Sequence, residues 1–239
     1  MKTIKIIRYR VCLLLLAISM MPMSMKAQYA DEEYKMELGV RLGGCYYLGD
    51  ANYLSLFKDM GIAAGIVGRY NLNPRMVIKC DLTMGQISGD TRSTNNVFPM
   101  GEEADFERTL YDLGAQFEYN FWPYGLGLTY RESRRFTPYI LGGLGMTYAA
   151  APADDIVTMH FALGGGVKYK FAPRWNVGCE FSMRFTLSDK LDVPAKSGLI
   201  LEDPYHIKGG TLKNKDSYSF VSLTVTYDLF PKCNNCNKD

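Results

Sequence analysis

The sequence has few of the residues that catalysis and metal binding usually need. It contains two histidines, His160 and His206, and they are not at the spacing of metal ligands. After residue 27 it also lacks any uncharged apolar run of about 18 residues, so we expect no membrane-spanning helix there. These shortages disfavour a metalloenzyme and a helical membrane protein, and we expect no metal site and no cofactor.

The first 27 residues have the features of an export signal. Basic residues between positions 2 and 10 precede an apolar run at 11–20, and Ala27 offers a small residue for cleavage. Five of the 27 basic residues lie in this leader, so removing residues 1–27 leaves 22 basic against 25 acidic residues. The basic isoelectric point therefore belongs to the leader, and nothing in the mature chain indicates nucleic-acid binding.

Most of the remaining chain alternates apolar and polar residues with a period of two. Met36, Leu38 and Val40 fall on one face, for example, while Glu37 and Arg41 fall on the other. This pattern is typical of β-strands. Eight such segments occur, at 36–48, 64–70, 76–84, 111–121, 140–148, 161–171, 177–185 and 221–229. Eight alternating strands favour a closed barrel, because closure removes exposed strand edges.

A soluble lipocalin-like barrel has its apolar face inside, whereas an outer-membrane barrel turns that face to lipid. Two features favour the outer-membrane barrel. The polar face mixes long charged side chains with many glycines, as a narrow packed lumen requires. Connections are short at 71–75 and 172–174 but long at 49–60, 88–104 and 188–216. The connection at 122–135 is an exception, because it lies at the end with the short turns but is longer than expected there. We therefore predict an all-β fold, an eight-stranded antiparallel transmembrane β-barrel, over residues 36–230.

Placement on the two faces predicts two groups of residues. Aromatic residues near the short-turn end of the apolar face are expected to form a membrane girdle, although an ordinary aromatic core is the alternative: Tyr70, Tyr119, Phe121, Tyr169, Phe171, Trp175 and Tyr227. Charged residues of the other face are expected to form a lumen network of ion pairs rather than to line a channel: Glu37, Arg41, Lys79, Asp81, Glu180 and Arg184.

Two hairpins have related sequences. The stretch YNLNPRMVIKCDLTM at 70–84 matches YKFAPRWNVGCEFSM at 169–183 in its Tyr, Pro, Arg, Cys and Met positions. Either an internal duplication or a shared structural requirement explains the repeat. In both cases Cys80 and Cys179 are expected to face lipid.

Three motifs carry a resemblance to a known family. They are GGCYYLGDAN at 43–52, GRYNLNPR at 68–75 and FTPYILGGLG at 136–145. In this order they resemble the PorG-like outer-membrane barrels of the type IX secretion system of Bacteroidota. The resemblance implies a non-enzymatic barrel that joins the outer membrane to a periplasmic ring, built of a lipoprotein and its partner. Outer-membrane lipid and this ring are the expected partners.

The C-terminal residues 231–239 form a predicted periplasmic tail that contains Cys233 and Cys236. Pro231 is expected to end strand pairing because it has no N–H. A local disulfide between the two cysteines and a tether to a periplasmic partner are both open. The short turns are the other candidate partner surface, through Asn73, Pro74, Arg75, Pro173 and Arg174. Residues 28–35 are expected to form an N-terminal periplasmic segment.

Two other functions compete with the anchoring function. One is an outer-membrane enzyme, lipid-modifying or protease-like, built on His206 and the nearby Glu202 and Asp203. The other is a stand-alone barrel that binds surface ligands through its loops. We expect no enzymatic activity, because a loop histidine such as His206 is more often solvated than catalytic and His160 falls on the lumen face.

Overall fold

The computed structural model describes residues 33–48, 60–90, 105–126, 133–150, 155–188 and 217–232. Eight strands fill these ranges, which confirms the predicted all-β fold. They are β1 (Glu33–Leu48), β2 (Gly61–Asn71), β3 (Met76–Asp90), β4 (Asp105–Asn120), β5 (Phe136–Ala149), β6 (Ile156–Ala172), β7 (Trp175–Thr186) and β8 (Ser217–Lys232). Within the same ranges there is no helix long and apolar enough to cross a membrane.

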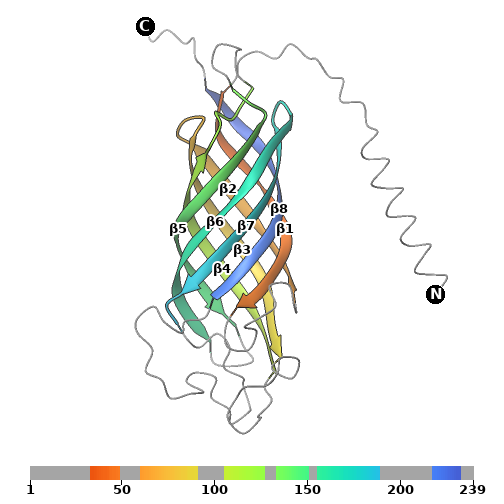
Figure 1. The fold of residues 1–239 in the computed structure, drawn as a ribbon, viewed down its shortest axis with the longest axis vertical. Coiled ribbons are helices and arrows are strands. Elements are labelled where there is room, and N and C mark those ends of the chain that lie inside the picture. The colour runs from red at the N-terminus through yellow and green to blue at the C-terminus, as the bar shows by residue number, and fades with distance from the viewer. Residues whose placement is uncertain are drawn as a thin grey trace, which may run out of the picture. The chain divides into compact units, whose positions relative to one another are not determined.

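The strands form one closed antiparallel sheet in the order of the chain (Figure 1). Closure comes from β1 and β8, which pair from Glu33↔Lys232 to Leu48↔Ser217. The turns after β2, β4 and β6 lie at the end of the barrel where β1 starts and β8 stops, and we call this end the short-turn rim. The opposite end is the long-loop rim. The related hairpins β2–β3 and β6–β7 lie on opposite sides of the barrel, because two strands separate them in each direction.

Burial alternates along most of each strand, and its direction is the reverse of that in a soluble barrel. The exceptions are residues 44–47 and 217–220 near the long-loop rim, which are all buried. Outward apolar side chains are exposed, such as Leu223 at 61% and Phe181 at 44%, whereas inward Arg41 and Glu180 are each 1% exposed. A continuous exposed apolar wall is stable only against lipid, because water would not offset the cost of its hydration. The chain is therefore a barrel of the outer-membrane type.

Two lumen-facing glycines show why small residues are needed inside. A Cβ at Gly39 would lie 2.0 Å from the backbone oxygen of Val225 on the next strand, so this close approach of β1 to β8 excludes any side chain. A Cβ at Gly114 would lie 2.8 Å from the Asp81 carboxylate. Glycine at this second position leaves room for a charged group that the network uses.

The first and the last strand of the barrel both extend beyond the boundaries predicted from the sequence. β1 begins at Glu33 rather than Met36, so the last three residues of the predicted N-terminal segment belong to the barrel. The expectation that Pro231 ends the pairing is wrong, because Tyr34 pairs with Pro231 and Glu33 with Lys232. Proline removes one donor but keeps its carbonyl, so it is tolerated near a strand terminus. The irregularity lies one residue earlier, at Phe230, whose φ of 56° is uncommon for a bulky residue.

Candidate functional site

The centre of the lumen is a network of buried ion pairs built around Glu180 and Asp81. Arg41 donates to both carboxylates, to Asp81 at 2.6 Å. Lys79 Nζ lies 2.8 Å from each oxygen of Glu180, and the Tyr139 hydroxyl donates to Glu180 at 2.8 Å. These groups come from β1, β3, β5 and β7. The network therefore connects opposite walls of the barrel.

Further partners surround Asp81. Gln116 Nε2 donates to its Oδ1 at 2.9 Å, and Arg184 lies 3.3 Å from its Oδ2. Arg184 also donates to the hydroxyl of Ser182. Each oxygen of Asp81 therefore has a donor, which is what a buried charge requires.

A second cluster around Glu118 lies nearer the short-turn rim. Arg69 Nε donates to Glu118 Oε1 at 3.0 Å, and Lys168 Nζ donates to Oε2 at 3.0 Å. Arg69 also lies 3.8 Å from Glu37, whose oxygens accept from Asn71 at 3.2 Å and from Thr226 at 3.2 Å. Every one of these carboxylates has both a cation and a neutral donor, or two cations, within reach.

Near the long-loop rim the lumen changes from ionic to apolar. A cluster that includes Cys45, Tyr47, Ile87 and Phe220 fills it. Tyr218 belongs to this cluster, and its hydroxyl donates to Asp112 at 2.5 Å and lies 2.6 Å from the Thr147 hydroxyl.

His160 belongs to the same group of side chains. Its Nδ1 lies 2.9 Å from the Thr147 hydroxyl and its Nε2 lies 3.4 Å from Asp112. His160 is only 1% exposed and packs edge to face against Tyr218. The imidazole is therefore buried among the described lumen side chains.

The connection between β4 and β5 closes the lumen at the short-turn rim. The Tyr124 N–H donates to the Pro74 carbonyl at 3.0 Å, and a backbone bridge joins Tyr124 to Arg134. This anchoring directs the Tyr124 ring over Lys168 and Lys170, at 5.3 and 5.5 Å from their ammonium groups. The Tyr124 hydroxyl donates to Asn176 at 2.8 Å. Burial raises the pKa of Tyr124, so the hydroxyl stays protonated and remains a donor.

The space beside Tyr124 is small. A cavity of about 50 Å³ lies between Tyr124, Glu37, Lys170 and Asp228, enough for a few water molecules. Lys170 and Asp228 pair across its wall, and Asn176 donates to Asp228 at 2.7 Å. The described part of the lumen is therefore a packed interior and not a passage for a peptide or a large solute.

The structure places the six predicted lumen residues inside the barrel, each 2% exposed or less. Five of them share the central network, while Glu37 belongs to the neighbouring cluster with Arg69. Among the predicted rim residues, Asn73 accepts from the backbone of Arg75 and Met76 at 2.8 Å each, and Arg75 and Arg174 are exposed. Cys233, Cys236 and His206 lie outside the described residues.

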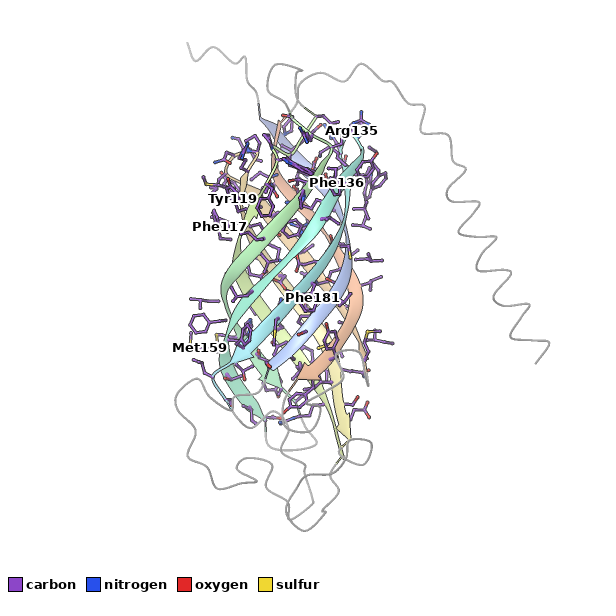
Figure 2. The ribbon with its side chains drawn as sticks, in the orientation of Figure 1. Phe117, Tyr119, Arg135, Phe136, Met159 and Phe181 are labelled. Atoms are coloured by element: carbon purple, nitrogen blue, oxygen red, sulfur yellow. The ribbon has the colours of Figure 1, made fainter. Side chains whose placement is uncertain are left out.

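The seven predicted girdle residues all lie on the outer face or at its rim. Tyr70, Phe121, Phe171 and Trp175 are 44–51% exposed, and Tyr119, Tyr169 and Tyr227 are half-buried. Figure 2 shows Tyr119 nearer the short-turn rim than Phe117 of the same strand. Exposed Cys80 and Cys179 lie on this face too, while Cys45 is buried in the lumen.

Sequence reasoning missed three residues that hold the interior together, Arg69, Tyr139 and Tyr124. The alternation contained a signal for the first two, because they neighbour the outward residues Tyr70 and Ile140 and so face inward. No comparable signal existed for Tyr124, which lies outside the alternating segments. Its position depends on backbone contacts with the turn between β2 and β3.

Within the described ranges no three histidine, cysteine or carboxylate side chains are grouped so that they could hold a metal ion. A family model described as a domain of unknown function, DUF6089, matches residues 10–238. The chain belongs to the DUF6089 family. No curated protein matches this DUF6089 chain.

Three solved barrels resemble this DUF6089 chain at low identity. Neisserial surface protein A is 16% identical with a TM-score of 0.43, and the match covers 82% of this chain and 97% of that one. The N-terminal β-barrel domain of Pseudomonas aeruginosa OprF is 13% identical with a TM-score of 0.41, covering 82% and 100%. The attachment invasion locus protein Ail of Yersinia pestis is 12% identical with a TM-score of 0.41, covering 84% and 100%.

Proposed function

We propose that this barrel is a non-enzymatic anchor in the outer membrane, which couples a periplasmic ring of the type IX protein secretion machinery to that membrane. The expected partners are the ring lipoprotein and its associated protein. The resemblance of the motifs at 43–52, 68–75 and 136–145 to PorG-like barrels suggests the machinery. The filled lumen is the observation that carries the anchoring part of the proposal.

A filled lumen supports an anchor because it leaves the outside of the barrel as the part available for interactions. Arg41, Lys79 and Glu180 bond across the interior, and Tyr124 covers its end at the short-turn rim. A packed polar interior makes the barrel rigid. A rigid barrel can transmit force between lipid and a bound ring without a conformational change of its own.

The short-turn rim has the structure expected of a fixed docking surface. The Pro74 carbonyl accepts from Asn120 Nδ2 at 3.1 Å and from the Tyr124 N–H at 3.0 Å. The Arg75 side chain donates to the Phe121 carbonyl at 3.3 Å. The turn between β2 and β3 is therefore held to the connection between β4 and β5, which reduces the entropy lost when a partner binds.

Cross-linking in native membranes, followed by purification through a C-terminal tag, tests the proposed function. We expect the ring lipoprotein and its partner to co-purify with the barrel. Cys233→Ser with Cys236→Ser should leave the barrel inserted and heat-modifiable on a gel, but remove a reducible higher-mass band and weaken export. Cys80→Ser is the matched control, since Cys80 is exposed on the lipid face.

Two outcomes of this experiment would change the proposal. If no ring component is captured with the wild-type chain, the anchoring proposal is wrong. If the double variant keeps its partner and exports normally, the tail holds only a local disulfide. The anchoring contact would then lie around Asn73–Arg75 and Pro173–Arg174.

The anchoring function also requires the short-turn rim to face the periplasm. An epitope inserted between residues 189 and 216 should bind antibody on intact cells, because it lies in the connection between β7 and β8 at the opposite end. An epitope placed after Asp239 should bind antibody only after the outer membrane is permeabilised. Antibody binding to the C-terminal epitope on intact cells would show that the topology is inverted.

A further inference from the structure

One arrangement of residues repeats four times around the barrel, at the border between the outer wall and the short-turn rim. The outermost outward-facing residue at this end of each odd-numbered strand lies opposite a tyrosine of an adjacent strand. The four register pairs are Met36↔Tyr70, Met76↔Tyr119, Phe136↔Tyr169 and Trp175↔Tyr227. Met36, Met76, Phe136 and Trp175 are 37–44% exposed. These eight side chains therefore form a level of apolar and tyrosine residues around the whole circumference.

A basic residue directly precedes each of the four outward residues in the sequence. Lys35, Arg75, Arg135 and Arg174 are all exposed, and we call them the basic ring. Figure 2 shows Arg135 beyond Phe136, toward the short-turn rim. The basic ring thus lies just beyond the aromatic level, where the headgroups of a bilayer would begin.

The exposed charged side chains that the structure describes at this border are all basic. Among the side chains that the structure describes there, the carboxylates of Glu37 and Asp228 are buried and paired, and none is exposed. At the long-loop rim the exposed charged side chains in the described ranges are Glu107 and Asp155. Among the described residues, the exposed charges are therefore basic at the short-turn border and acidic at the long-loop border.

We propose that the basic ring binds the phosphate groups of anionic phospholipids in the leaflet next to the short-turn rim. Each guanidinium can donate two parallel hydrogen bonds to one phosphate, and the lysine acts as a point charge. The tyrosines at the neighbouring level place the ring at headgroup depth, because amphipathic rings prefer the membrane interface.

The circumferential spacing favours lipid over a docked protein. A partner protein bound to the barrel wall contacts one sector of it, whereas lipid surrounds all sides equally. The basic ring has one member at each of β1, β3, β5 and β7, that is, at every second strand. Arg174 is also held in place, since its Nε donates to the Tyr34 hydroxyl at 3.2 Å.

The two tryptophans of the chain make this proposal measurable. Trp122 and Trp175 both lie at the short-turn rim and are 37% and 44% exposed. Their fluorescence therefore reports on lipid at this border alone. The full-length mature chain would be folded into vesicles of phosphatidylcholine that contain brominated phosphatidylglycerol or, separately, brominated phosphatidylcholine with the same acyl chains.

Wild-type protein should prefer phosphatidylglycerol about fivefold at low ionic strength, measured as the ratio of the two quenching constants. About 1 M NaCl, where the screening length is about 3 Å, should abolish the preference. The variant Lys35→Gln/Arg75→Gln/Arg135→Gln/Arg174→Gln should show a ratio near one at every salt concentration. The control Arg75→Lys/Arg135→Lys/Arg174→Lys keeps the charges and should keep the salt-sensitive preference.

Heat-modifiability on a gel shows which variants have folded. If the fourfold variant does not fold, the double variant Lys35→Gln/Arg135→Gln replaces it. These two side chains make no hydrogen bond or ion pair in the described structure, so their replacement should not disturb folding. The double variant should lose about half of the preference for phosphatidylglycerol on a logarithmic scale. Equal quenching by both lipids in wild type overturns the proposal. An unchanged preference in the folded glutamine variant also overturns the proposal. If that variant in addition loses a cross-linked protein partner, the basic ring is a protein-docking surface instead.

Discussion

Phe181→Arg should lower the free energy of unfolding in bilayers by about 2–4 kcal/mol. Phe181 faces outward from β7 at 44% exposure, and Figure 2 shows it near the middle of the barrel's length. An arginine there must either desolvate its charge in hydrocarbon or deform the bilayer to reach water. Urea titration of protein folded into phospholipid vesicles, with tryptophan fluorescence as the signal, measures the change.

The control for this prediction is the same substitution at Phe185 of the same strand. Phe185 is also outward-facing, at 40% exposure, but it is the second-last residue of β7, close to the long-loop rim. Phe185→Arg should lower the free energy of unfolding by only about 0–1 kcal/mol, because an outward-facing arginine destabilises a barrel less the nearer it lies to the membrane interface. Equal stability of Phe181→Arg and wild type would mean that this face does not contact lipid.

Glu180→Gln should lower the free energy of unfolding by about 3–5 kcal/mol. The Glu180 carboxylate pairs with Arg41 and Lys79 and lies 3.9 Å from Arg69, and all four side chains are buried in the lumen. Glutamine keeps the shape but removes the negative charge, which leaves these cations buried without enough compensation. The same urea titration measures the loss, and heat-modifiability shows whether the barrel still closes.

Ser222→Ala provides the matched control for Glu180→Gln. Ser222 is the register partner of Glu180 on β8, is 3% exposed, and has an Oγ without a hydrogen-bond partner in the described structure. Removing an unpaired hydroxyl should leave stability unchanged or raise it slightly. If both variants unfold at the wild-type urea concentration, the ion pairs do not contribute to stability, and the lumen is held by packing alone.

Part of the central network could be predicted from sequence because each of its members has a fixed face. Arg41 and Lys79 alternate with apolar neighbours, and a residue's face in a strand follows from its parity. Which charge pairs with which could not be predicted. Arg41 and Glu180 are separated by 139 residues, and they meet because barrel closure and the stagger of eight strands bring β1 and β7 to the same height.

The sequence by itself determined the eight strands, the apolar wall toward lipid and the position of the short turns, because period-two alternation and turn residues act locally. Only the tertiary structure decided the ends of β1 and β8, the closure by Tyr124 and the alignment of the basic ring. β8 continues through Pro231 because β1 begins early enough to pair with it, at Tyr34. Tyr124 covers the lumen at the short-turn rim because its N–H donates to the carbonyl of Pro74, in a turn 50 residues earlier in the chain. Such contacts depend on which strands become neighbours and in what register, and a local pattern carries no information about either.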